Sequence, residues 1–279
     1  MRIVVTSGYN KSLHAIALVH LLAAQGQNVV LCLQVRLFNI ARLRFYLHQV
    51  GLRKLISKIQ RAGFWPGKIE TTSVYEEVRP MLDYFCENKI HSKTVGQACK
   101  AVRARLVNVS SLNSPKALDA LRQADADLVV YAGGGILRKY FIQTPKVGVL
   151  NAHAGPLPQF RGMNATEWAL FHGVKPKITF HYIDCGIDTG EILFSKSVST
   201  DALASVYALR GRATRVSVEG LLEVVKRISE GKIQPVAQDI NAGRQFFVMA
   251  DPLLEVLKRW IVNRSTPMVD CENFKWPKK

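Results

Sequence analysis

The first quarter of the sequence lacks acidic residues. No Asp or Glu precedes Glu70, although ten Lys or Arg do, and the chain of 279 residues carries a formal net charge of +17. Such an uneven charge favours an anionic partner, which could be a phosphorylated ligand, a nucleic acid or membrane headgroups. The charge alone does not choose between these partners.

Closely spaced cysteines and long apolar runs are also missing. The five cysteines form no Cys-x-x-Cys pair, so we predict reduced thiols rather than a zinc site or a disulfide framework. The apolar run after Met1 ends at Ser7-Gly8 and is too short for a secretory signal. The apolar window over residues 16–24 is well below the roughly 20 residues that span a bilayer. We therefore expect a cytoplasmic protein.

The order of the predicted elements indicates an α/β domain. Apolar segments rich in β-branched residues predict buried strands at residues 3–6, 28–33, 106–109, 127–132, 147–150, 178–183 and 193–198. Periodic segments between most of them predict helices, which is typical of a Rossmann-like, mostly parallel sheet with helices on both faces. We expect this catalytic domain over residues 1–200 and a mainly helical C-terminal segment over residues 201–279.

A basic segment interrupts this alternation. Residues 38–62 place apolar side chains at roughly helical spacing, with Arg and Lys between them and no acid to neutralise them. The basic stretch from residue 36 to 61 could contact a membrane surface, steer an anionic substrate, or form an ordinary solvated helix face, which we take as the default. We do not expect it to carry the chemistry.

Small, polar and turn-forming residues concentrate between Asn151 and Leu193. Asn151 and His153 lie where a short apolar strand ends, and their side chains point to the same side because they are two residues apart on extended chain. The strand over 178–183 leads into a glycine-containing loop that could bring Asp188 to the imidazole. An amide, an imidazole and a carboxylate would then face one volume. Taken singly, a structural histidine or a turn-forming Asp is the commoner explanation.

The same stretch resembles the folate-dependent formyltransferase family, which includes glycinamide ribonucleotide, methionyl-tRNA and sugar N-formyltransferases. The elements that carry the resemblance are Asn151-x-His153, Leu157-Pro158-x-x-Arg161-Gly162, Trp168, Thr179-x-His181-x-x-Asp184 and Gly186-x-Asp188-x-Gly190. The resemblance implies transfer of a formyl group from 10-formyltetrahydrofolate to a primary amine, without a metal ion. It assigns catalysis to Asn151, His153 and Asp188. One departure is Ala154-Gly155-Pro156-Leu157-Pro158 after the His, where many relatives have Ser-Leu-Leu-Pro, so a side-chain hydroxyl contact is absent there.

The requirements of formyl transfer suit this trio. Attack of an amine on a carbonyl creates an oxyanion and requires two proton movements. The amide of Asn151 can donate to the oxyanion, and His153 can take or give a proton near neutral pH. Asp188 can orient the imidazole, favour its charged form, or hold a water. We leave His181 as a structural residue and assign Arg161 no proton transfer.

The resemblance also implies two binding regions. The residues expected near the pterin are Gly135, Ile136, Leu137 and Asp184. The residues expected to hold a phosphorylated acceptor, in the turn after the first strand, are Gly8, Asn10, Lys11 and Ser12. An ordinary capped turn before a helix is the alternative for the second group.

The acceptor that we favour is an amino-sugar nucleotide. The same trio could instead hydrolyse formyltetrahydrofolate. Methionyl-tRNA is a further alternative, although relatives that act on it usually append a β-barrel and this C-terminal segment looks helical. An inactive homologue that binds RNA or a membrane through its basic face is the non-enzymatic alternative, and a homodimer is compatible with the sequence.

Overall fold

The computed structural model describes residues 1–36, 71–263 and 268–276. The basic segment predicted over residues 38–62 therefore lies outside the described residues. None of the helices within the described ranges combines the length and the apolar character needed to cross a membrane.

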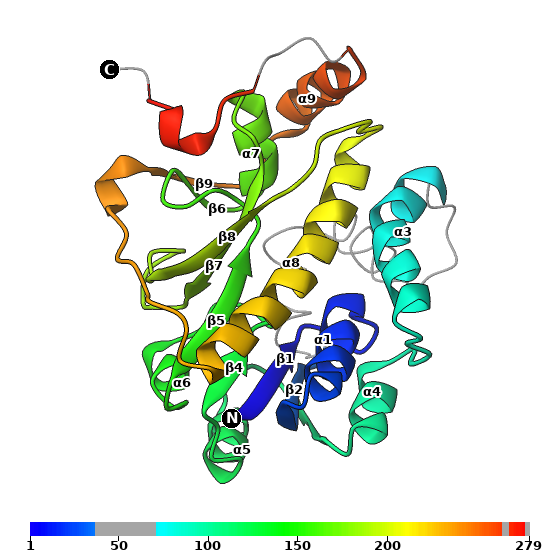
Figure 1. Ribbon diagram of the computed structural model, residues 1–279, viewed down its shortest axis with the longest axis vertical. Helices are drawn as coiled ribbons and strands as arrows, with labels where there is room; N and C mark the ends of the chain where they lie inside the picture. The colour runs from blue at the N-terminus through cyan, green and yellow to red at the C-terminus, as the bar shows by residue number, and fades with distance from the viewer. Residues whose placement is uncertain (37–70, 264–267, 277–279) are drawn as a thin grey trace, which may run out of the picture.

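A seven-stranded sheet forms the centre of the structure (Figure 1). Across the sheet its strands are β3 (Arg105–Val109), β2 (Asn28–Val35), β1 (Arg2–Ser7), β4 (Leu128–Val130), β5 (Gly148–His153), β7 (Lys177–Tyr182) and β8 (Ile192–Ser197). The first five strands pair in parallel, whereas β7 is antiparallel to both β5 and β8. This confirms the predicted Rossmann-like, mostly parallel sheet. The strand order reverses between β1 and β4, and ligands of such sheets bind beyond the carboxyl ends of the strands at this switch point.

Helices cover both faces of the sheet, as the sequence predicts. The helices on one face are α1 (Leu13–Ala24), α3 (Thr71–Glu87), α4 (Val95–Ala101) and α8 (Val206–Ser229). The helices on the other are α5 (Pro115–Gln123) and α6 (Lys139–Ile142). The buried side chains of β1 divide between the two cores, since Ile3 and Val5 belong to the first and Val4 to the second. Alternation of side chains along a strand produces this division.

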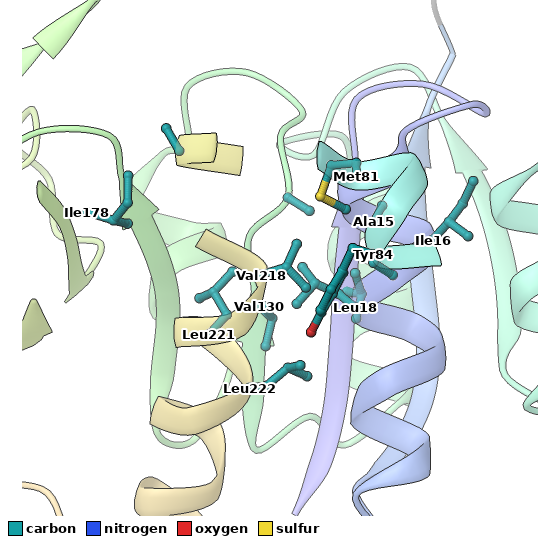
Figure 2. Close-up of a cluster of buried hydrophobic side chains, with 14 of the residues drawn as sticks. Ala15, Ile16, Leu18, Met81, Tyr84, Val130, Ile178, Val218, Leu221 and Leu222 are labelled. Atoms are coloured by element: carbon teal, nitrogen blue, oxygen red, sulfur yellow. The ribbon is translucent and has the colours of Figure 1, made fainter. Parts of the chain in front are cut away.

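Two glycines allow α8 to lie close to its neighbours. A Cβ atom placed on Gly220 would lie 2.0 Å from the ring of Phe180 in β7, and one placed on Gly211 would lie 2.5 Å from the carbonyl oxygen of Glu77 in α3. Figure 2 shows the resulting core, in which residues of α8 lie near α3, α1 and the sheet: Val218, Leu221, Leu222, Met81, Tyr84 and Leu18. The longest helix after residue 200 therefore shares the core of the first 200 residues.

From β9 onward the C-terminal segment packs around α7 (Ala165–Phe171), as Figure 1 shows. The elements of the segment after α8 are η1 (Ile240–Ala242), β9 (Arg244–Phe246), α9 (Asp251–Asn263) and η2 (Cys271–Asn273). It is mainly helical, as predicted, but β9 pairs in parallel with a short strand that the sequence did not predict, β6 (Phe160–Gly162). Aromatic rings pack at this contact. The ring centroid of Phe160 lies 5.4 Å from that of Phe246 and 5.2 Å from that of Trp276.

Replacement of Gly220 in α8 by Ala tests the close packing of this helix, and the same replacement at Gly96 in α4 is the control. Gly220→Ala should lower the free energy of unfolding by about 1–3 kcal/mol, because the ring of Phe180 is fully buried and cannot move aside. Gly96→Ala in α4, whose new methyl would meet its nearest neighbour at 3.5 Å, should raise it by roughly 0.5–1 kcal/mol. Urea denaturation measures both. Equal stabilisation by the two substitutions would contradict the packing.

Candidate active site

Antiparallel pairing of β5 with β7 forms the base of the candidate site. Asn151 lies directly opposite His181, and His153 lies opposite Thr179. Opposed side chains of an antiparallel pair share a face of the sheet. Nδ2 of Asn151 lies 3.1 Å from Nε2 of His181, and Nδ1 of His181 lies 2.8 Å from the carbonyl oxygen of Tyr182. A neutral His181 that donates Nδ1–H to this carbonyl accepts an N–H of Asn151 at Nε2, which orients the amide and leaves its second N–H for a ligand.

The loop after β7 brings Asp188 to His153. Its Oδ2 lies 3.3 Å from Nδ1 of His153, and its Oδ1 lies 3.6 Å from Nε2 of His181. Asp188 has a φ of 55°, which is uncommon for a residue other than glycine. Two contacts hold it there: the amide of Gly162 donates to Oδ2 over 2.9 Å, and Nε2 of Gln238 donates to its carbonyl oxygen over 3.1 Å. The structure therefore brings the three residues predicted as catalytic together.

The main chain of β6 fixes the proton on the ring of His153. Nε2 of His153 donates to the carbonyl oxygen of Phe160 over 2.8 Å, so Nδ1 is the basic nitrogen of the neutral ring. Burial lowers the pKa of His153, while the charge of Asp188 and the Phe160 carbonyl oppose that shift. The ring is thus mainly neutral at pH 7, and a proton that arrives at Nδ1 faces a carboxylate.

The carboxyl group of Asp188 is held in its charged form. Burial alone would raise the pKa of Asp188, but the neighbouring rings of His181 and His153 and the amide of Gly162 together lower it. The side chains of His153 and Asp188 are only 6% and 18% exposed. Their interaction therefore acts in a medium of low dielectric, where it is stronger than in water.

Two cavities border the contact between His153 and Asp188, since Asp188 lines one and His153 lines the other. The first, of about 130 Å³, is lined by Asn151, His181 and Asp188. The second, of about 350 Å³, is lined by His153, by its neighbours Ala152 and Ala154, and by residues of four helices.

The residues predicted to lie near a pterin all line the first cavity: Gly135, Ile136, Leu137 and Asp184. The hydroxyl of Tyr131 accepts from the amide of Gly135 and donates to its carbonyl oxygen, which fixes the turn after β4. Oδ1 of Asp184 accepts from the amide of Gly186 over 3.0 Å and from the hydroxyl of Thr189 over 2.7 Å. Asp184 therefore also shapes the loop that carries Asp188.

The predicted phosphate-binding turn lies at the switch point of the sheet but outside the lining of both cavities. A Cβ atom on Gly8 would lie 3.5 Å from the amide nitrogen of Gly134 in the neighbouring turn. Ser12 caps α1, because its hydroxyl oxygen accepts from the amide of Ala15 over 3.3 Å. Asn10 and Lys11 are exposed. Of α1, His14 is the residue that reaches the second cavity.

The structure explains why this chain has Gly155 in the stretch where many relatives have Ser-Leu-Leu-Pro. A Cβ atom there would lie 2.4 Å from Cβ of Ala165 and 2.8 Å from Nε2 of His153. Thr179 holds this turn instead, since its hydroxyl donates to the carbonyl oxygen of Gly155 over 2.7 Å and accepts from the amide of Leu157 over 3.2 Å. The backbone beside His153 is therefore positioned without a serine.

Sequence reasoning missed two contributors to this geometry. His181 was left as a structural residue, but it contacts Asn151 and faces Asp188. The Thr-x-His motif was visible, whereas the register that places His181 opposite Asn151 was not. Gln238 comes from a segment without a pattern, and no signal in the sequence connects it to Asp188. Across the described parts of the chain, no group of three or more His, Cys, Asp or Glu side chains is arranged to hold a metal ion.

Comparison with known proteins identifies the family. The model described as "Formyl transferase" matches residues 85–225, just over half of the chain. A methionyl-tRNA formyltransferase of Caldanaerobacter subterraneus is 32% identical over 128 residues, which cover 45% of this chain and 41% of that protein. The chain thus aligns with about two fifths of the length of such curated relatives.

Two solved structures share the fold at low identity. Glycinamide ribonucleotide transformylase 1 from Symbiobacterium toebii has a TM-score of 0.56 and 17% identity, over 85% of this chain and 94% of that one. A sugar N-formyltransferase from a Shewanella species has a TM-score of 0.52 and 15% identity, over 89% of this chain and 77% of that one. Together with the family match and the arrangement of the trio, this leads to one conclusion. The chain belongs to the formyl transferase family, whose members are folate-dependent N-formyltransferases.

Proposed function

We propose that this protein transfers a formyl group from 10-formyltetrahydrofolate to a primary amine of a small acceptor, for which an amino-sugar nucleotide is the leading candidate. The observation that carries this proposal is the contact of 3.3 Å between Nδ1 of His153 and Oδ2 of Asp188, with one cavity at each of the two residues and Asn151 beside them. Membership of the formyl transferase family supports the class of reaction.

The first cavity suits the folate. Ile136 at its edge is 79% exposed and Ile187 is 39% exposed. Large exposed apolar side chains beside a glycine turn suit the face of a flat ring, and the backbone groups of the turn suit its polar edge. When bound, the folate supplies a formyl group on an amide-like nitrogen. Asn151 would direct its free N–H to the formyl oxygen and stabilise the negative charge that develops there.

The acceptor amine would approach from the side of the second cavity, which His153 lines. As the new C–N bond forms, the proton that the amine loses passes to Nδ1 of His153, directly or through a water held by Asp188. The carboxylate of Asp188 stabilises the resulting imidazolium. His153 then returns the proton to the departing nitrogen of the folate as the old C–N bond breaks. This restores the neutral ring.

The turn formed by Gly8, Asn10, Lys11 and Ser12 is our proposed site for a phosphate of the acceptor. Three features support it. The turn lies at the switch point of the sheet, it precedes a helix of 12 residues whose N-terminus carries partial positive charge, and the Lys11 side chain is exposed.

Substitution of the trio tests the reaction. Asn151→Ala, His153→Ala and Asp188→Ala should each lower kcat for formyl transfer roughly 10²–10⁴-fold, because each removes a donor, a base or its counter-charge. Formyl transfer to candidate amines is measured beside formate release without amine, and calorimetry follows tetrahydrofolate binding. The exposed His91→Ala serves as the control and should keep full activity. Near-normal turnover of Asp188→Ala, or formate release that added amines do not reduce, would contradict the scheme.

The protonation of His153 provides a second test. Because burial lowers its pKa below 6.5, the neutral base should persist as the pH falls through 6.5 and be lost only below it. Asp188→Asn removes the negative charge that raises this pKa, so the pKa should fall further. Titration of the ring by NMR, assigned with His153→Gln, gives both values. A pKa above 6.5, or one that rises in Asp188→Asn, would contradict the assignment.

A further inference from the structure

The second cavity is bordered by four helices, by β5 and by the end of β6. The side chains that matter for its chemistry are His14 of α1, Glu77 of α3, Glu167 of α7, and Arg210 and Thr214 of α8. Because His153 also lines the cavity, a molecule bound there lies against the proposed base. Its lining should therefore show which acceptors can reach the reacting atoms.

The charge of the lining opposes an anion. Glu167 has a side chain that is only 5% exposed, and its Oε1 accepts from Nε and Nη2 of Arg210, each over 2.7 Å, and from Nδ2 of Asn164 over 2.9 Å. This ion pair is neutral overall, and its contacts with the described residues use Oε1, which leaves Oε2 for a ligand. Glu77 adds a negative charge. Such a lining attracts an ammonium ion and repels a phosphate.

Apart from Arg210 and Asn164, the hydrogen-bonding side chains of the lining offer mostly acceptors. Three hydroxyls donate to main-chain carbonyl oxygens: Thr166 to Ala154, Thr214 to Arg210 and Ser217 to Ala213. Because a hydroxyl has one hydrogen, the oxygens of these groups can only accept from a ligand. Together with the carboxylates of Glu77 and Glu167, they suit a ligand that is rich in donors. A phosphate offers mainly acceptors, and the donor side chains of the lining, Arg210 and Asn164, already bond Glu167.

His14 provides an independent sign of a ligand. Its Nε2 atom is buried and has no hydrogen-bond partner among the described residues. Burial lowers the pKa of His14 to about 4, so the ring is neutral at pH 7. Buried polar atoms of native proteins are nearly always hydrogen-bonded, and an exception calls for an explanation. A hydroxyl of a molecule in the cavity would supply the missing partner.

We propose that the second cavity selects the amine-bearing part of the acceptor as a polyhydroxylated ammonium ion, such as an amino-sugar ring, and that Glu167 and His14 determine this specificity. Glu167 holds the ammonium, which loses one proton to solvent before the free amine attacks and His153 takes the second, and His14 hydrogen-bonds a ring hydroxyl. A phosphate of the same acceptor stays outside the cavity. The proposal rests on the proposed function for the reaction, but its binding test needs no turnover.

Binding of three small probes tests the selection. Glucosamine carries both the ammonium and the hydroxyls, cyclohexylamine carries only the ammonium, and glucose carries only the hydroxyls. Saturation-transfer NMR on the full chain should give a dissociation constant for glucosamine about tenfold or more below that of either other probe, because hydrogen bonds to charged groups in a buried site are strong. Equal affinity for glucosamine and either of the other probes would overturn the proposal.

Glu167→Gln tests the carboxylate. The substitution keeps the shape of the side chain and removes its charge, so the affinity for glucosamine should fall about tenfold or more, towards that of glucose. Glu223→Gln is the matched control, because Glu223 pairs with Arg227 on α8 away from the cavity. It should leave glucosamine binding unchanged. Unchanged binding in Glu167→Gln would remove Glu167 from the site.

His14→Leu separates binding from stability. It removes a nitrogen that lacks a partner, so Tm should stay the same or rise while the affinity for glucosamine falls severalfold. His20→Leu on the same helix is the control, because it loses the hydrogen bond between Nε2 of His20 and the hydroxyl of Ser92. It should lower Tm and leave binding unchanged. A lower Tm with unchanged glucosamine binding in His14→Leu would show that His14 only packs the core, and would overturn its role.

Failure of the reaction can be distinguished from failure of this selection. Selective binding of glucosamine by a protein that transfers no formyl group would refute the proposed function and retain the cavity's specificity. Formyl transfer to amines with no preference for glucosamine over cyclohexylamine would support the proposed function and refute the specificity of the cavity.

Discussion

The short strand β6 holds both members of the contact between His153 and Asp188. The carbonyl oxygen of Phe160 accepts from Nε2 of His153, and two residues later the amide of Gly162 donates to Oδ2 of Asp188. One segment of main chain thus fixes the tautomer of His153 and the position of the carboxylate beside it. This segment is itself held by β9, since a Cβ atom on Gly162 would lie 2.2 Å from the carbonyl oxygen of Phe246.

The C-terminal segment therefore helps to position the residues of the site. Gln238 donates to the carbonyl oxygens of Asp188 and Gly190, β9 supports β6, and α8 contributes Arg210 and Thr214 to the second cavity. The two cavities differ in character because different elements build them. The first is formed by loops at the ends of β4 and β7, and the second by helices packed on β5.

The features that the sequence could predict are those with a local pattern. Apolar β-branched runs predicted the strands of the sheet, and the motifs predicted that Asn151, His153 and Asp188 lie close together. The strands β6 and β9 have only three residues each and no apolar alternation, so they were not predictable as a pair. The first helix of the C-terminal segment expected from residue 201 begins at Val206, because Ser205 caps it through the amide of Ala208. The partners of His181 and Gln238 depend on register and long-range packing, which carry no local signal.

In the proposed reaction, His153 and Asp188 stand between a folate on one side and an amine on the other. A crystal structure of the protein with tetrahydrofolate and glucosamine tests this most directly. The account predicts the folate nitrogen that carries the formyl group beside Asn151, the amine in the second cavity beside Glu167, and His153 within hydrogen-bonding reach of both, about 2.6–3.2 Å or through one water. Both molecules in one cavity, or a folate whose reactive nitrogen lies away from Asn151, would contradict it.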